Sequence, residues 1–178
     1  QAFHSIVPGS VMEYYPSVGV KRDVGSRPET KFFGIRALTS CKWLFDYSGN
    51  DKSFGGPFKD NPKMPGWEYY DNQNNFDIWE NKYFVPYGFS YDNYVSLENF
   101  NNTLEANRNL LMMKAIVLEN NQIQKYADIL QELKNTSAID YSNEAYFSDC
   151  IERKNNSCSY FSYDKFGFSA KFENTSDK

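Results

Sequence analysis

The chain has 178 residues and a formal net charge of −4, with 19 Lys and Arg against 23 Asp and Glu. This length suits a single domain, and the interspersed charges form no basic stripe, which argues against nucleic acid as a partner. Aromatic residues make up 18% of the sequence and offset an apolar share of only 40%, so we expect a folded core rather than disorder.

The beginning of the chain predicts two short helical segments. Residues 6–15 fit a helix that starts near Pro8 and ends before Pro16. Residues 29–35 fit a helical turn. The longest apolar run lies near residues 110–118, and because Lys114 interrupts it, the run is far shorter than the roughly 20 residues of a membrane span.

Period-two alternation predicts a strand over residues 37–45. Its apolar face would carry Ala37, Thr39, Cys41, Trp43 and Phe45, so Cys41 is expected to be a buried free thiol. The following stretch, residues 48–66, is rich in Gly, Pro, Asn, Asp and Lys and predicts a long loop.

A β-hairpin and a further strand are expected next. Residues 67–70 and 76–80 flank the polar run 71–75, which fits a hairpin loop. Val85, Tyr87, Phe89 and Tyr91 then alternate along a strand, and Pro86 within it favours an edge position or a bulge.

Residues 97–154 predict a block of about three helices. The first carries apolar positions between Phe100 and Leu118 on roughly one face. The second would begin at an N-cap, Asn121, and its apolar residues follow a helical period as far as Leu133. The third is expected over residues 142–153.

Two strands, residues 158–162 and 166–172, are expected at the end of the chain. Strands, helices and again strands in this order predict an α+β fold with an antiparallel or mixed β-sheet and a central helical block. We expect one domain over residues 1–178, cut from a longer protein.

Three cysteines cannot form a complete set of disulfides. Cys150 and Cys158 enclose seven residues, a spacing that permits a local disulfide in an oxidising compartment, and two free thiols are the alternative. Because His4 is the single histidine and no Cys-x-x-Cys pair exists, we expect no metal site, and nothing in the sequence calls for a cofactor.

Three segments share their order and spacing with one known family. Residues 31–40 match a segment F-G-V-K-Y-L-L-S, residues 78–89 match V-Y-E-N-x-x-A-L-P-L-G-F, and residues 108–118 match the helix that follows. Over about residues 16–174 the chain thereby resembles bacterial membrane proteins of the YfhO type. The most specific part is Glu80-Asn81 with Pro86 and Gly88. Residues 167–174 resemble the strand that leads into a later extracytoplasmic segment.

Two positions depart from the family pattern. Ala37 stands where the family usually has an aromatic residue, and Phe84-Val85 replace Ala-Leu. Neither change breaks a predicted strand, and both fit variation in packing.

The resemblance implies a parent protein with many membrane spans, similar to lipid-linked sugar transferases of the GT-C type. Such proteins are tied to the glycosylation of cell-envelope polymers such as lipoteichoic acid. It implies that this chain lies at the extracytoplasmic face of the bacterial membrane, beside the membrane spans of its own parent. The catalytic acids of such transferases lie in loops near the first spans, so we expect no catalytic residue here.

Four residues are candidates for contact with a cell-envelope glycan: Trp67, Glu80, Asn81 and Tyr83. Aromatic rings with polar neighbours suit the faces of pyranose sugars, and Trp67 and Tyr83 are the aromatic residues expected at exposed strand or loop edges. In the alternative, Glu80 ends a strand and Asn81 bonds the backbone in a turn. A wider aromatic set could stack on sugars or fill the core: Trp67, Tyr69, Tyr70, Trp79, Tyr83, Tyr87, Tyr91 and Tyr94.

Three functions remain open. The first is a non-catalytic accessory domain that packs against membrane spans and guides a glycan acceptor, which a broad apolar patch near both termini would favour. The second is a freestanding carbohydrate-binding module, which an exposed aromatic row beside polar side chains would favour. The third is a small secreted glycan hydrolase, which needs two carboxyls about 5–10 Å apart. Its candidates are Asp71 with Asp77 and Asp46 with Asp51.

Overall fold

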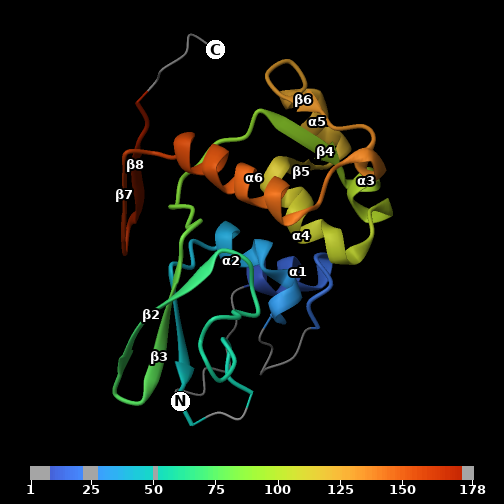
Figure 1. The fold of residues 1–178 in the computed structure, drawn as a ribbon. Helices are drawn as coiled ribbons and strands as arrows, with labels where there is room; N and C mark the ends of the chain where they lie inside the picture. Colours follow the sequence, from blue (N-terminus) through green and yellow to red (C-terminus); the bar gives the residue numbers. More distant parts are fainter. Residues whose placement is uncertain (1–8, 22–27, 50–51, 174–178) are drawn as a thin grey trace.

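The computed structural model of the chain describes residues 9–21, 28–49 and 52–173. Within these residues, six α-helices accompany three small β-sheets (Figure 1). Most helices gather in one block, while the sheet β1–β3–β2 and the hairpin β7–β8 extend from it in different directions (Figure 1). The expected α+β class is confirmed.

Two short helices open the described chain. Helix α1 spans Gly9–Ser17 and so contains Pro16 in its last turn, while residues 6–8 of the expected helix lie outside the described residues. A 3-10 turn, Thr30–Phe32, and helix α2, Gly34–Leu38, occupy the position of the expected helical turn.

The prediction of a strand over residues 37–45 is wrong for the first half of this range. Helix α2 extends to Leu38, and Ser40 has a left-handed backbone with φ of 53°, so the chain turns before strand β1, Trp43–Tyr47, begins. The backbone N–H of Thr39 donates to the Ile35 carbonyl, and this helical bond outweighs the local alternation. Cys41 lies in the turn and is only partly buried.

The predicted hairpin is present, but its loop is shorter than the predicted residues 71–75, because residues 71–73 pair with β3. Strands β2, Trp67–Gln73, and β3, Phe76–Asn81, pair antiparallel, and β1 pairs with the other edge of β3. Asn74 and Asn75 form the turn with φ of 51° and 63°, which suits the two-residue hairpin turn that asparagine tolerates. The pairing of β2 with β3 shifts between Tyr69 and Asp71, so Tyr70 lies at a bulge.

Residues 85–91 do not form the strand that their alternation predicts. Their β-pairing is limited to an isolated bridge between Phe89 and Ser157. Pro86 has no N–H to give to a sheet, and Gly88 has φ of 75°, so the segment bends.

The helical block also contains short strands. It comprises β4 (Asn93–Ser96), α3 (Leu97–Asn102), α4 (Glu105–Lys114), β5 (Ile116–Leu118), α5 (Asn120–Tyr126), β6 (Gln131–Glu132), a 3-10 turn (Thr136–Ala138) and α6 (Asn143–Asn155). The three strands form a parallel sheet in the order β5–β4–β6. Residues 97–154 therefore contain four helices and two strands rather than about three helices.

Helix α5 differs most from its prediction. Glu119 rather than Asn121 caps it, in a reciprocal arrangement with Gln122, and it ends at Tyr126. The residues expected to continue the helix instead join β4, because the Leu133 N–H donates to the Tyr94 carbonyl at 2.8 Å. The helical period was therefore overridden by pairing with a distant strand.

The last helix and the last two strands form close to their predicted positions. Helix α6 begins at its N-cap Ser142, whose hydroxyl accepts a bond from the Ala145 N–H. Strands β7, Tyr160–Asp164, and β8, Gly167–Lys171, form the expected antiparallel pair, and both stand mostly in solvent.

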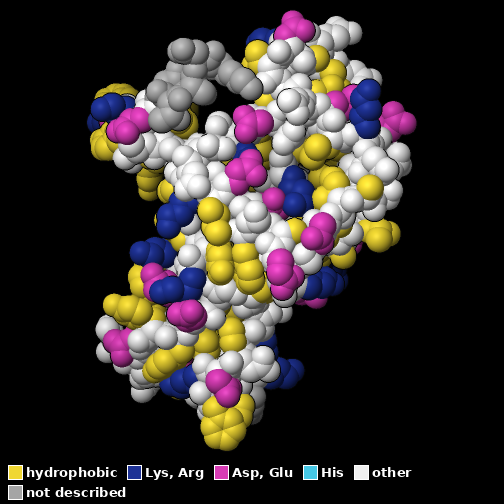
Figure 2. All heavy atoms as spheres, turned by 45° about the horizontal axis from the view of Figure 1, so that its top comes forward, with side chains coloured by type: hydrophobic (Ala, Val, Ile, Leu, Met, Phe, Trp, Pro, Cys, Tyr) yellow, Lys and Arg dark blue, Asp and Glu magenta, His cyan; other side chains and the backbone are white. Residues whose placement is uncertain are grey.

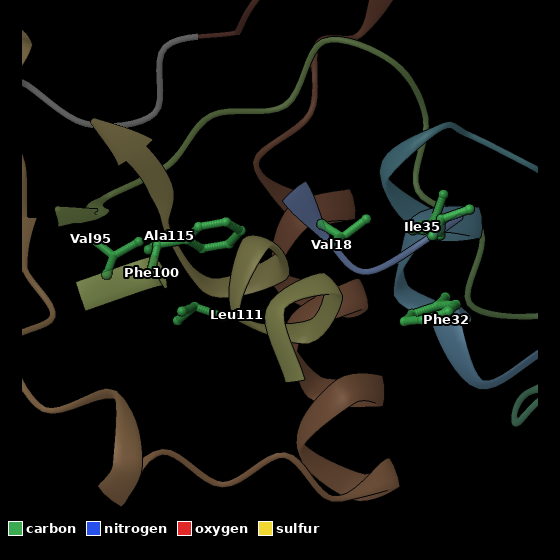
Figure 3. Packing of buried hydrophobic residues seen from close by; sticks show 8 residues of the cluster. Val18, Phe32, Ile35, Val95, Phe100, Leu111 and Ala115 are labelled. Atoms are coloured by element: carbon green, nitrogen blue, oxygen red, sulfur yellow. The ribbon is translucent and has the colours of Figure 1, made fainter. Parts of the chain in front are cut away.

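Three apolar clusters hold the fold together. The first gathers residues from α1, α2, α3, α4 and β4 (Figure 3), with Val18, Phe32, Ile35, Val95, Phe100, Leu111 and Ala115 buried in or beside those elements. The second joins α2, α4 and α6 through Ala37, Val85, Leu110, Met113, Tyr146 and Cys150. The third lies beneath one face of the sheet β1–β3–β2 and contains Phe54, Met64, Trp67 and Trp79.

Candidate functional site

The sheet β1–β3–β2 has one covered face and one exposed face. Residues 52–66 fold over the covered, or inner, face, where Phe54 packs edge-on against Trp67 and Trp79. Side chains alternate along each strand, so the neighbours of these buried residues point to the opposite side. We call that side the outer face.

Five aromatic side chains stand on the outer face. Their exposed fractions are 37% for Trp43, 63% for Phe45, 55% for Tyr47, 41% for Phe76 and 61% for Tyr70. Hydrophobic side chains also reach the surface beside charged ones in the lower part of Figure 2. Exposed apolar side chains that lie together on one face make that face a candidate contact surface.

The five rings form two edge-on pairs with one ring between them. The Trp43 and Tyr70 rings are 4.9 Å apart at 66°, and the Tyr47 and Phe76 rings are 5.8 Å apart at 64°. Phe45 lies between the pairs on β1 and is opposite Ile78 of β3. The aromatic row therefore follows β1 from end to end.

A balanced set of charges borders the Trp43 end of the row. Glu80 lies opposite Trp43 in the sheet. Its carboxylate forms ion pairs with Lys82 Nζ at 3.1 Å and with Lys42 Nζ at 3.8 Å. Lys82 forms a second ion pair, with Glu68, at 3.8 Å. The hydrogen bond to Glu80 and the nearby negative charges raise the pKa of Lys82, which stays a cation. Two lysines and two glutamates thus offer donors and acceptors with no net charge.

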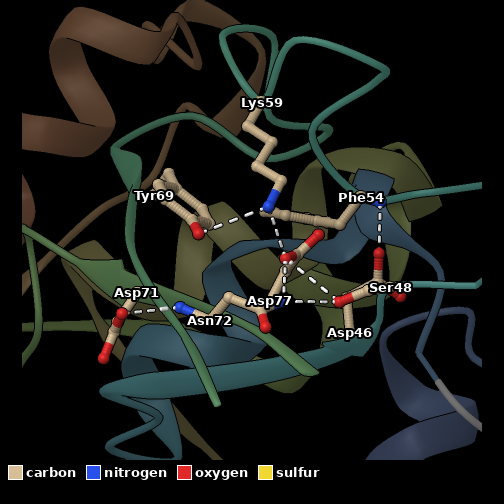
Figure 4. Close-up of polar contacts among 8 residues, drawn as sticks. All are labelled: Asp46, Ser48, Phe54, Lys59, Tyr69, Asp71, Asn72 and Asp77. Atoms are coloured by element: carbon tan, nitrogen blue, oxygen red, sulfur yellow. Dashed lines mark hydrogen bonds and ion pairs between the residues drawn. The ribbon is translucent and has the colours of Figure 1, made fainter. Parts of the chain in front are cut away.

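Polar contacts on the inner side of the sheet are structural. Asp77 Oδ1 accepts bonds from Lys59 Nζ at 2.6 Å, Asn72 Nδ2 at 2.7 Å and the Ser48 hydroxyl at 3.2 Å (Figure 4). Asp46 Oδ2 accepts the Phe54 N–H at 2.6 Å. Burial raises the pKa of Asp77, but the hydrogen bonds outweigh burial and hold the pKa below its usual value. The network ties the loop 52–66 to the sheet.

Of the two carboxylate pairs expected for a hydrolase, the pair that the structure describes, Asp71 with Asp77, does not come together. Asp71 is paired with Ile78, whose side chain points to the outer face, whereas Asp77 points inward. Asp46 belongs to the structural network, and Asp51 lies outside the described residues. Asp71 and Asp77 therefore do not form the paired carboxyls of a hydrolase.

A surface hollow of about 580 Å³ near α3 and α5 contains two other carboxylates, Glu98 and Glu119. Glu119 is engaged in capping α5, and every residue that lines the hollow is exposed to solvent. Carboxylates that act as paired acid and base need environments that separate their pKa values, usually through burial. This hollow lacks such an environment.

Of the four predicted glycan-contact residues, two are buried, one is half-buried and one borders the outer face. Trp67 is wrong as an exposed contact, because the loop 52–66 covers it and leaves 2% exposed. Asn81 is also buried, and its side chain donates to the Cys41 carbonyl and accepts the Tyr83 N–H, which is the predicted turn-forming alternative. Tyr83 is half-buried and stacks on Phe147 at 4.1 Å. Glu80 alone borders the outer face.

The wider aromatic set divides in the same way. Trp67, Trp79 and Tyr94 are buried, and the Tyr91 hydroxyl donates to the Met112 carbonyl. Tyr70 joins the outer face. Prediction missed Trp43, Phe45, Tyr47 and Phe76 as contact residues. For Trp43 and Phe45, alternation identified a shared strand face without showing which face the loop 52–66 would cover.

The three cysteines are free thiols in this structure. Cys150 and Cys158 are buried without a bridge, Cys150 among residues of α4 and α6, and Cys158 with its thiol donating to the Tyr87 carbonyl at 3.2 Å. Burial raises the pKa of Cys150 to about 12, so its thiol stays protonated. The local disulfide is therefore not formed here.

The described part of the chain contains neither a metal-binding cluster nor a membrane-spanning helix. Among residues 9–21, 28–49 and 52–173, no three His, Cys, Asp or Glu side chains are placed to hold a metal ion. In the same residues no helix has the length and hydropathy for a membrane crossing.

Comparison with family models, curated proteins and solved structures finds no match for this chain.

Proposed function

We propose that this chain is a non-catalytic, extracytoplasmic accessory region of a YfhO-type envelope protein, and that the outer face contacts a cell-envelope glycan. The observation that carries the glycan contact is the exposed row of five aromatic rings beside paired lysines and glutamates. The accessory role rests on the family resemblance, since the aromatic row by itself would fit a freestanding carbohydrate-binding module equally well. Flat rings cover the apolar faces of pyranose sugars, and the border supplies partners for their hydroxyls. Partners would be the membrane spans of the parent chain and the glycan.

The segments that carry the family resemblance support a common structural unit. Residues 31–40 and 108–118 meet where the Gly34 N–H donates to Asn109 Oδ1 at 2.9 Å. Residues 78–89 reach the same core through Val85, which packs in one cluster with Ala37 and Leu110. The resemblance therefore rests on residues that pack together, which is what a shared fold requires.

The absence of catalysis is supported by the placement of the acids. Among the described candidate carboxylates, Asp46 and Asp77 hold the loop 52–66, and Asp71 stands on the opposite side of the sheet from Asp77. Any transfer of sugar by the parent would then use residues outside this chain. Such an arrangement leaves binding or positioning of a glycan as the task of the outer face.

Tryptophan fluorescence tests the contact directly. Of three tryptophans, Trp43 is 37% exposed, while Trp67 and Trp79 are 2% and 1% exposed, so iodide should quench mainly Trp43. Purified lipoteichoic acid should protect Trp43 from iodide, and Trp43→Ala should weaken binding about tenfold. Phe166→Ala, an 87% exposed aromatic on another element, is the matched control and should bind normally.

Two results would contradict the proposal. Unchanged quenching, with equal binding by Trp43→Ala and the unaltered chain, would remove the outer face as the contact. Turnover of a glycan by the 178-residue chain, lost on removal of one carboxylate, would show that the chain is catalytic. A freestanding carbohydrate-binding module fits the same face, and the two differ in whether the parent polypeptide fractionates with membranes.

A further inference from the structure

The length of the aromatic row sets the size of its ligand. Trp43, Phe45 and Tyr47 alternate on β1 and all point to the outer face. Residues two apart in a strand are separated by about 7 Å, so the row extends over roughly 14 Å. A row of this length exceeds one pyranose ring and follows the direction of the strand.

The edge-on pairs mark the two ends of this row. At one end Tyr70 meets Trp43, and at the other Phe76 meets Tyr47. The two ring planes are inclined to one another by 66° in the first pair and by 64° in the second. A sugar that stacks on one ring would therefore also contact the second ring along its edge. Two such corners on one strand provide two separate places for sugar rings, with Phe45 between them.

The charges around the row select an uncharged ligand. At the Trp43 end, Lys42 and Lys82 are balanced by Glu68 and Glu80. Asp71, paired with Ile78 on the same face, adds one negative charge, which further disfavours an anionic ligand. Sugar hydroxyls both donate and accept, so they match lysine donors and carboxylate acceptors together. The phosphates of a polyanion such as lipoteichoic acid would be attracted by the lysines and repelled by the glutamates and would gain little, so its uncharged sugar units would make the contact.

The area of the outer face argues against a folded protein as its occupant. Three strands about 4.8 Å apart and about 17 Å long present roughly 240 Å². Stable protein interfaces bury about 800 Å² on each partner. A second copy of this chain or another globular protein would therefore need much more surface than the outer face offers.

We infer that the outer face binds a linear, uncharged oligosaccharide along β1, with one sugar at the Trp43–Tyr70 corner and another at the Tyr47–Phe76 corner. This inference rests on the proposed glycan contact and adds the chemical class and the length of the ligand. It also assigns Tyr47 a role that appears only when the ligand is long enough to reach it.

Affinity against ligand length tests the inference. The probes are N-acetylglucosamine and its β-1,4-linked oligomers from disaccharide to hexasaccharide, together with glucose and the matching malto-oligosaccharides. Binding to the full 178-residue chain is followed by calorimetry and by iodide protection of Trp43. In at least one series, affinity should rise about tenfold or more from the monosaccharide to the tetrasaccharide and then level off.

Variants locate the two corners. Tyr47→Ala should abolish the gain with length but change monosaccharide binding less than about threefold, whereas Trp43→Ala should weaken both. Phe166→Ala is again the matched control. Since Tyr47 and Trp43 are exposed, unfolding midpoints should stay near that of the unaltered chain, and this is measured for each variant.

Each outcome decides a separate point. Equal affinity for monosaccharide and hexasaccharide overturns the two-corner inference but leaves the glycan contact in place. Tighter binding of hexagalacturonate than of the neutral hexasaccharides overturns the uncharged class. No binding of any of these sugars overturns the inference, and protection of Trp43 by lipoteichoic acid in that case would still support the proposed function.

Discussion

The backbone N–H of Gly34 donates a hydrogen bond to Oδ1 of Asn109 at 2.9 Å, across 75 positions of the sequence. Asn109 is fully buried, and its own side-chain nitrogen donates to the Ala106 carbonyl. A Cβ on Gly34 would lie 2.6 Å from both the backbone and the side-chain oxygen of Asn109. Helices α2 and α4 can approach this closely only because residue 34 has no side chain.

Gly34→Ala should therefore destabilise the protein by about 1–3 kcal/mol, the usual cost of forcing extra atoms into a packed core. Urea unfolding followed by circular dichroism measures the change. Ser148→Ala, at an exposed position of α6, is the control and should stay within about 0.5 kcal/mol. Equal stability of Gly34→Ala and the unaltered chain would show that α2 and α4 are less closely packed than described.

Asp77→Asn tests the ion pair beneath the sheet. The pKa of Asp77 lies below its usual value of 3.8, so the unfolded chain binds a proton more readily than the folded chain between these two pKa values. The charged pair with Lys59 thus stabilises the fold above about pH 4, and this contribution is lost as the pH falls through the folded-state pKa.

The variant should consequently be less stable than the unaltered chain at pH 7, and the difference should shrink on acidification below pH 4. Unfolding free energies across this range give the comparison. Asp149, whose pKa is raised mainly by burial, is present in both proteins and cancels. A difference that stays constant down to pH 2 would mean that the charge of Asp77 does not matter.

Thiol alkylation should distinguish the three cysteines. Cys41 is partly exposed, whereas Cys150 and Cys158 are buried, and the pKa of Cys150 is raised to about 12. At pH 8 in the native state, iodoacetamide should modify Cys41 at least about tenfold faster than the other two, because only accessible thiolate reacts. Peptide mass spectrometry measures each rate. A Cys150–Cys158 disulfide peptide recovered from native protein would instead support the bridge permitted by the sequence.

The β7–β8 hairpin should contribute little to the stability of the main body. Phe168 is 74% exposed, and its ring contacts Phe161 of the same hairpin. Phe168→Ser should change the unfolding free energy by less than about 0.5 kcal/mol, whereas Trp79→Ala, which empties a site that is 1% exposed, should cost about 3–5 kcal/mol. Comparable losses in the two variants would mean that the hairpin belongs to the cooperative core.

The residues of the outer face could be predicted from the sequence only in part. Glu80 and Tyr70 were among the residues considered, and both border or occupy the outer face. Trp43 and Phe45 were placed on one strand face, but that face was expected to be apolar and buried. Alternation shows which residues share a face, and it carries no information on which face the loop 52–66 will cover.

Elements that depend on near neighbours could be predicted from the order of the residues alone. The Asn74–Asn75 turn, the Ser142 cap of α6 and the final hairpin are all set by residues within a few positions of one another. Three features became evident only in the folded chain: the end of α5, the loss of the strand at residues 85–91 and the exposure of the outer face. These features depend on partners far along the chain, since a backbone hydrogen bond or a covering loop from a distant segment outweighs a local preference.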